Sequence, residues 1–347
     1  MRRKKGSEAC QGGLTLIELV VALAIGLVVI GAVYRTFSTQ QRTYTVQEQV
    51  AEAQQNARAA MSILMRDLRM AGYGKPEGDV QISGETYNHS IDVAKDPEQE
   101  DSDLITLVGC FGSPKGYLTR TADKGETQIE VRSTGNELSQ IFRADASKYI
   151  FIGGVDKLAV DDAPESVKGV LILNGPLTKR YPTGVLSGGV DPGATEIPLE
   201  TTEGLRAGDV LFLGEDRLMV RDVGTETITI DIDPEVAGNQ GISTGHPEGT
   251  CVNPIPVYRL TALLYSIETD DSEPKRPIQY LSRNDKVEGD RRTKLAEYIQ
   301  KLQVPLYDPP LCTIEVTART RVKDPDYREN EGYRTRTLKS QVKLRNL

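Results

Sequence analysis

Residues 1–33 read MRRKKGSEACQGGLTLIELVVALAIGLVVIGAV, a short basic segment followed by a long apolar one. From Leu14 to Val33 there are 20 residues, and only Thr15 and Glu18 among them are polar. An α-helix rises about 1.5 Å per residue, so this segment would span roughly 30 Å, the hydrocarbon thickness of a bilayer. The sequence therefore predicts one membrane-spanning helix at Leu14–Val33.

The residues before the apolar segment indicate its orientation and its type. The basic residues 2–5 predict that the N-terminus stays in the cytoplasm and that the rest of the chain is exported. A secretory signal places its small-residue cleavage site after the apolar run, whereas here Gly12 and Gly13 precede it and no A-x-A directly follows it. A lipoprotein signal fails too, because nothing apolar precedes Cys10.

Glu18 is the residue that a plain membrane anchor leaves unexplained. A carboxylate near the bilayer centre costs about 2.5–3.5 kcal/mol on insertion scales, so an acidic residue inside an apolar helix is a functional candidate. An opposite charge nearby would offset this desolvation.

The string G-G-L-T-L-I-E-L resembles the class III signal of type IV prepilins. The resemblance implies that a prepilin peptidase cuts after Gly13 and that Leu14, where the family usually has Phe, becomes an N-methylated terminus that keeps its positive charge. Glu18 then becomes the fifth residue. The resemblance also implies that the terminal amine of a neighbouring subunit docks against the Glu18 carboxylate during assembly.

The helix is predicted to continue well beyond the membrane segment. No proline occurs before Pro76, and apolar or small residues recur at helical spacing, which predicts one helix from Leu14 to about Met70, roughly 85 Å long. Gly26 and Gly31 weaken it by about 1 kcal/mol each, and permit either local unwinding or close helix packing. The string M-R-D-L-R-M-A-G-Y-G, Met65–Gly74, ends the helix and resembles a signature of PilW-type minor pilins.

Beyond residue 80 the pattern changes to short β-branched runs bounded by turn residues. Residues 74–102 are expected to form a loop over the sheet, and L-A-E-Y-I-Q-K-L-Q-V-P-L-Y-D is expected to join a short helix to a strand. The expected fold is α+β and pilin-like, a long N-terminal helix packed on an antiparallel sheet. The candidate strands are Leu104–Val108, Thr127–Val131, Tyr149–Ile152, Val170–Leu173, Val257–Ile267, Cys312–Val322 and Thr335–Leu344.

Residues 183–235 alternate short apolar runs with tight turns. They are predicted to form either an inserted β-rich module or an enlarged loop of the main head. The domain organisation is therefore a leader at 1–13, a transmembrane and filament helix at 14–74, and an extracytoplasmic head at 75–347 that includes this insertion.

The charge and the residue content of the head argue against several other functions. The formal net charge is −8, and because residues 1–13 hold four basic residues and one acidic residue, the chain from Leu14 has a net charge of −11. Such an acidic head is not expected to bind nucleic acid. With only His89 and His246 available, we expect no metal site, no cofactor and no catalysis.

Three cysteines remain after the leader, at wide and irregular spacings. In an extracytoplasmic setting one disulfide and one free thiol are expected. We favour the pair Cys251 and Cys312, with Cys110 as the alternative partner.

The resemblance implies a minor pilin that primes a type IV pilus or lies at its tip, with a role in cell adhesion as a further expectation. Its expected partners are major and minor pilins, the prepilin peptidase and the inner-membrane assembly platform. It would begin as a single-pass inner-membrane protein with a periplasmic head and end in the pilus on the cell surface. The alternatives are a J-like pseudopilin of a type II secretion system and a membrane-anchored binding domain that does not polymerise.

Overall fold

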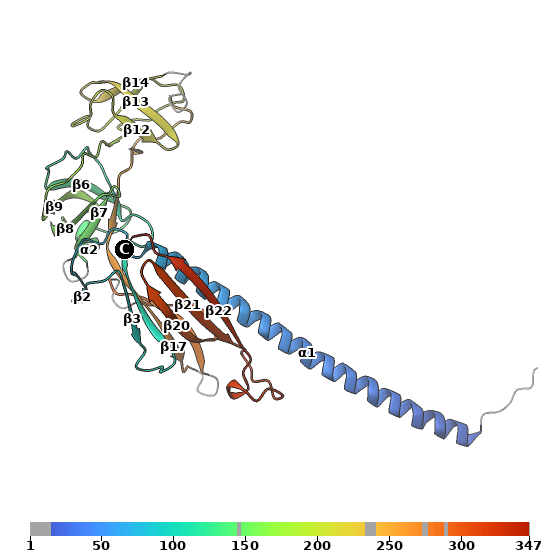
Figure 1. The fold of residues 1–347 in the computed structure, drawn as a ribbon. Helices are drawn as coiled ribbons and strands as arrows, with labels where there is room; N and C mark the ends of the chain where they lie inside the picture. The colour runs from blue at the N-terminus through green and yellow to red at the C-terminus, as the bar shows by residue number, and fades with distance from the viewer. Residues whose placement is uncertain (1–14, 144–146, 233–240, 273–276, 288–290, 347) are drawn as a thin grey trace, which may run out of the picture. The chain divides into compact units, whose positions relative to one another are not determined.

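A computed structural model describes residues 15–143, 147–232, 241–272, 277–287 and 291–346 (Figure 1). The chain divides into two compact units. One unit contains the helix up to Gln55 together with residues 319–336, and the other contains residues 56–318 and 337–347.

The helix α1 runs from Leu16 to Met70, and no proline interrupts it. It ends at a turn in which Gly72 and Gly74 both have a positive φ, a conformation that glycine adopts without strain. A side chain at Gly74 would also collide with the sulfur of Cys110 and the ring of Phe151. The stop that the sequence predicts is therefore required by both the backbone and the packing.

In the first unit, residues 319–336 link the last two strands and include a short 3-10 helix at Asn330–Gly332. Asp324 organises this segment, because it accepts hydrogen bonds from Arg334 at 2.7 Å and from the backbone of Asp326 at 3.0 Å. The guanidinium of Arg319 lies 4.3 Å from the centre of the Tyr333 ring.

The second unit is built on a five-stranded antiparallel sheet with the order β19-β18-β17-β4-β3. A three-stranded sheet with the order β20-β21-β22 and a β1–β2 ribbon complete this part of the head. The bounds are β1 Val80–Ile82, β2 Glu85–Tyr87, β3 Ile91–Lys95, β4 Asp103–Gly109, β17 Thr261–Asp270, β18 Ile278–Asp285, β19 Arg291–Glu297, β20 Ile299–Asp308, β21 Leu311–Arg319 and β22 Thr335–Lys343.

Two local predictions for this region are wrong. Residues 74–102 are not one loop, because β1, β2 and β3 lie within them. The expected short helix in L-A-E-Y-I-Q-K-L-Q is instead the end of β19 and the start of β20, with Tyr298 between them at a positive φ. Pairing of β19 with β18 and of β20 with β21 overrides the helical propensity of this string.

A six-stranded closed barrel, which the sequence did not predict, occupies much of the middle of the chain. Its strands follow the order β16-β5-β6-β9-β8-β7 around an apolar core that includes Leu118, Ile129, Ile150 and Leu171, all fully buried. The bounds are β5 Gly116–Leu118, β6 Gln128–Ser133, α2 Leu138–Ile141, β7 Tyr149–Ile152, β8 Asp156–Asp162, β9 Lys168–Leu173 and β16 Pro256–Arg259.

A second β body, here called the module, comprises residues 183–253. Four of its strands form a sheet with the order β11-β14-β13-β12, and β10 pairs with β15. It has its own core, in which Leu186, Ile197, Leu211 and Ile228 are fully buried. The bounds are β10 Gly184–Val185, β11 Glu196–Pro198, β12 Val210–Leu213, β13 Asp216–Val223, β14 Thr227–Asp231 and β15 Cys251–Val252.

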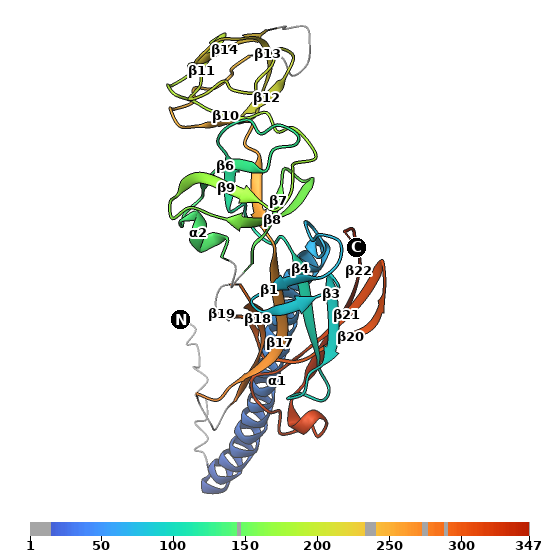
Figure 2. The same ribbon diagram turned by 90° about the vertical axis from the view of Figure 1, so that its left-hand side faces the viewer.

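The two β bodies are nested insertions in the head (Figure 2). Gly109 at the end of β4 pairs with Thr261 at the start of β17, so residues 110–260 leave and re-enter the main sheet between adjacent strands. The module lies in sequence between the barrel strands β9 and β16, and Gly184 pairs with Val252 where it begins and ends. The long helix followed by antiparallel sheets confirms the α+β, pilin-like fold.

Candidate assembly site on the N-terminal helix

The first part of α1 carries large apolar side chains that remain exposed on every side. Within the described part of Leu14–Val33, Leu16 is 83% exposed and Val28 is 73% exposed. Gly26 and Gly31 have no other atoms within 4 Å of the place where a side chain would begin, so they leave open notches along the helix. This helix is long and apolar enough to cross a membrane, and its surface requires either lipid or other helices.

Glu18 lies in the first turn of α1, where Thr15 caps the helix. Its Oε2 accepts hydrogen bonds from the backbone N–H and from the hydroxyl of Thr15, each at 2.9 Å. The backbone N–H of Glu18 donates in return to the Thr15 hydroxyl oxygen at 3.4 Å. This reciprocal arrangement is a capping box, in which the carboxylate is held at the positive end of the helix dipole.

The other predicted cleavage and methylation residues, Gly13 and Leu14, lie outside the described residues. Sequence reasoning identified Glu18 but missed Thr15 as its partner. The signal was present, because T-x-x-E before an apolar run is the pattern of a capping box.

The last part of α1, within the second unit, is anchored in the head by buried contacts. Leu64 and Leu68 are fully buried, as is Ala71 directly after the helix. Asp67, on the same part of the helix, accepts a hydrogen bond from the hydroxyl of Tyr265 at 2.5 Å and one from Arg283 at 3.3 Å. Burial raises the pKa of Tyr265, and the charge of Asp67 raises it further, so the hydroxyl keeps its proton and remains a donor.

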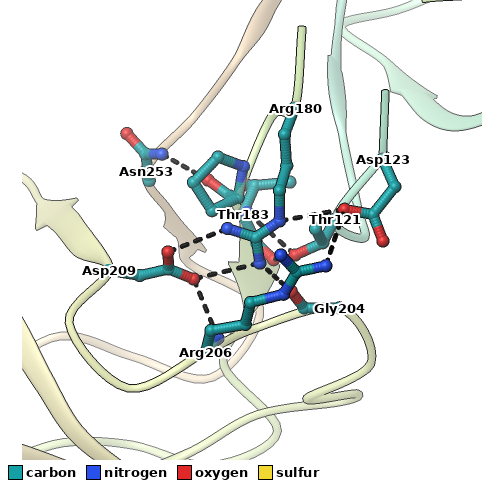
Figure 3. A network of polar contacts seen from close by, with 9 residues as sticks. Thr121, Asp123, Arg180, Thr183, Gly204, Arg206, Asp209 and Asn253 are labelled. Carbon is teal, nitrogen blue, oxygen red and sulfur yellow. Dashed lines mark hydrogen bonds and ion pairs between the residues drawn. The ribbon is translucent and has the colours of Figure 1, made fainter. Parts of the chain in front are cut away.

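The barrel and the module are joined by the polar network in Figure 3, which centres on Arg180. Its guanidinium donates to Asp123 of the barrel at 2.9 Å and to both carboxylate oxygens of Asp209 of the module, at 2.8 and 3.1 Å. It also donates to the carbonyl of Gly204. Hydrogen bonding to Asp209 is the main cause of the raised pKa of Arg180.

The two chain segments that connect the barrel to the module beside Arg180 are also held by hydrogen bonds. Thr121 donates its hydroxyl to the carbonyl of Thr183 at 3.1 Å and accepts from the Thr183 N–H at 3.2 Å. Asn253 donates its side-chain amide to the carbonyl of Pro182. The chain therefore enters and leaves the module through residues that are fixed to each other and to the barrel.

Cys110, Cys251 and Cys312 are all free thiols in the structure, and the pair Cys251 and Cys312 stays a prediction. Cys251 lies in β15, which pairs with β10 of the module, and Cys312 lies in the β20-β21-β22 sheet. Burial raises the pKa of Cys110 to about 12 and that of Cys312 to about 11, so both remain protonated at neutral pH.

In the described part of the chain, no three His, Cys, Asp or Glu side chains are grouped to hold a metal ion. His246 lies 3.6 Å from Asp216, but Ser243 donates its hydroxyl to Asp216 at 2.6 Å and not to the imidazole. These residues brace the turn that follows β12, and they do not form a Ser-His-Asp relay.

Comparison with known families adds a direct match at the N-terminus. Residues 9–34 match a family model described as the prokaryotic N-terminal methylation motif. The motif indicates a type IV pilin-like or pseudopilin precursor. It covers Gly13, Leu14 and Glu18 and supports a prepilin-type class III signal. Comparison with curated proteins finds no match to the chain.

The motif and the apolar helix together indicate a membrane-anchored, single-pass protein. The family that carries this motif is structural, and the motif implies processing by a prepilin peptidase and assembly with other pilins.

Proposed function

We propose that the chain is a minor pilin that primes a type IV pilus or lies at its tip. The observation that carries this proposal is the capped carboxylate of Glu18 at the start of an exposed apolar helix, inside the methylation motif. A helix of this kind is suited first to a bilayer and then to a bundle of similar helices.

Assembly would proceed through a charge that appears only after processing. Cleavage after Gly13 creates an ammonium group on Leu14, and methylation keeps it positive. When helices of neighbouring subunits pack, the ammonium of one subunit meets the Glu18 carboxylate of another, which offsets the cost of removing both from water. Thr15 already holds the carboxylate at the helix end, where an incoming amine can reach it.

The terminal position follows from the size of the head. Residues 110–260 form two extra β bodies beside the pilin-like sheet, and such bulk opposes regular stacking of subunits along a shaft. The M-A-G-Y-G element and the resemblance to PilW-type proteins favour the pilus over a type II secretion filament. The module is then displayed at the surface, where it would serve adhesion.

The proposal is tested with Glu18→Ala, using Glu48→Ala on the exposed polar part of the same helix as the control. The amount of each variant in sheared filaments is measured by immunoblot, and the N-terminus is determined by mass spectrometry. We expect both variants to begin at methylated Leu14. We also expect Glu18→Ala to be reduced in filaments about tenfold or more, because a buried ammonium without its partner costs several kcal/mol.

Normal incorporation of Glu18→Ala would disprove the charge pairing, and a mature protein that begins at Met1 would disprove the filament role. The terminal position has its own test, because antibody against the head should label filament ends. Labelling along the whole filament would contradict it.

A further inference from the structure

A cavity of about 560 Å³ lies in the head beside the turn that ends α1. This volume is in the range of small-molecule sites in proteins. It is lined by the turn 72–78, by the β7–β8 hairpin with Phe151 and Lys157, by Ser90 and by Asn346, all within the second unit.

Lys75 contributes a buried ammonium group to this cavity. The residue is only 8% exposed, and its Nζ donates to the carbonyl of Gly78 at 2.6 Å and to that of Pro76 at 3.4 Å. Both acceptors are neutral. Among the described residues, no carboxylate lies within 4.0 Å of Nζ of Lys75 or of Lys157.

Lys157 brings a second positive charge to the same cavity from the exposed side of β8. The pKa of Lys75 is lowered, chiefly by burial; the charge of Asp79 opposes this shift, and the charge of Lys157 adds to it more weakly. The side chains that line the cavity thus carry two positive charges, Lys75 and Lys157, and one negative charge, Glu77. An anion placed between the two ammonium groups would relieve this imbalance.

The rest of the wall indicates what kind of anion fits. Tyr73 and Phe151 form an edge-to-face pair with ring centres 4.8 Å apart, and both line the cavity. Glu77 also lines it, from an exposed position, and would repel a large, multiply charged ligand. Aromatic walls suit the carbon part of a ligand, and an ammonium group suits a single carboxylate.

We propose that this cavity binds the carboxylate of an organic ligand between Lys75 and Lys157, with its carbon chain against Tyr73 and Phe151. The ligand is either a free small carboxylate or the C-terminal carboxylate of another polypeptide. The site is distinct from Glu18 and does not depend on the proposed role in a pilus.

The test is calorimetric titration of the full chain in detergent micelles with three probes, at constant ionic strength. The probes are succinate, a short unstructured peptide with a free C-terminal carboxylate, and the same peptide with a C-terminal amide. The variants are Lys75→Met and Lys157→Met, with Lys124→Met as the control because Lys124 is an exposed lysine of the barrel outside the cavity. Lys157 is exposed, so its substitution does not threaten folding.

We expect saturable binding that Lys157→Met and Lys75→Met each weaken about tenfold or more, since a charged hydrogen bond contributes about 1.5–3 kcal/mol. Lys124→Met should bind as the unmodified chain does. Binding of the peptide acid but not of its amide or of succinate identifies a chain terminus as the ligand, and binding of succinate identifies a free carboxylate. Absence of saturable binding for all probes, or equal binding by all variants, overturns the proposal.

Discussion

Tyr265 on β17 donates its hydroxyl to Asp67 on α1 at 2.5 Å, although the two residues are 198 positions apart in the chain. Tyr265 is fully buried and Asp67 is 4% exposed. A buried hydroxyl and a buried carboxylate without partners would each cost free energy, and here each satisfies the other. Arg283 adds positive charge to the pair, so the rotation of this part of α1 against the main sheet is fixed by polar contacts as well as by packing.

Replacing Tyr265 by Phe should destabilise the head by about 1–2 kcal/mol, because Asp67 stays buried and loses its strongest donor. The free energy of unfolding is measured by urea titration of the full chain in micelles. Tyr44→Phe serves as the control, since Tyr44 is on the same helix and 70% exposed. Equal effects of the two substitutions would show that the Tyr265–Asp67 hydrogen bond contributes nothing.

Replacing Arg180 by Met should loosen the connection between the barrel and the module, because Asp123 and Asp209 both lose the Arg180 guanidinium. Asp123 then keeps the Arg206 guanidinium, at 3.7 Å. The Arg180–Asp209 ion pair is partly exposed, so we expect the contact between the barrel and the module to lose about 1–2 kcal/mol of stability. The fraction of molecules in which this contact is open should then rise roughly five- to thirtyfold. Limited digestion with proteinase K should then cut faster near Pro182 and Asn253. Lys179→Met is the neighbouring control, and cleavage at the same rate in both variants would contradict the role of Arg180.

Acidification should destabilise the module through Asp216. Burial raises the pKa of this carboxyl, but hydrogen bonds from the hydroxyl and backbone of Ser243, together with His246 at 3.6 Å, outweigh burial and leave the pKa below its usual value of 3.8. A depressed pKa in the folded state means that the stabilisation is present above about pH 4 and is lost as pH falls below that value.

We therefore expect the melting temperature of the unmodified chain to fall as the pH is lowered from 5 to 3. The melting temperature of Asp216→Asn should fall by less over the same range. Asp222→Asn is the control because Asp222 is an exposed carboxylate on the same strand, β13. The prediction is contradicted if Asp216→Asn leaves the acid dependence unchanged.

The parts of this fold that the sequence predicts are those encoded by neighbouring residues. The helix follows from a proline-free run with a glycine stop at Gly72 and Gly74, and Glu18 is conspicuous because it is acidic in an apolar segment. The hydrogen bonding between Thr15 and Glu18 could be predicted from the T-x-x-E pattern of residues 15–18. Each of these features depends on contacts within one or two helical turns.

The barrel and the module depend on pairing between distant segments. β16 pairs with β5 and with β7, more than 100 positions earlier in the chain, and none of these strands exceeds four residues. Their short apolar runs resemble those of any surface hairpin. Spacing along the chain likewise does not show that Cys251 and Cys312 lie in different sheets.

The nesting of the two insertions leads to a prediction for a shortened chain. Because Val185 pairs with Cys251, residues 186–250 can be replaced by an Asn-Gly turn that joins β10 to β15. The barrel core shares no residue with the core of the module, so the barrel should keep its strands and the main sheet should be unaffected. The circular dichroism spectrum should lose only the contribution of the module, and cooperative thermal unfolding should persist.

Deleting β9, residues 168–173, provides the contrast, because it opens the barrel between β6 and β8 and should abolish cooperative unfolding of this region. The shortened chain also tests the proposed terminal position. If the bulk of the head restricts the protein to filament ends, removing the module should allow more copies per filament, as counted with antibody against the main sheet. An unchanged count would mean that the module does not limit stacking, and the terminal position would then need another cause.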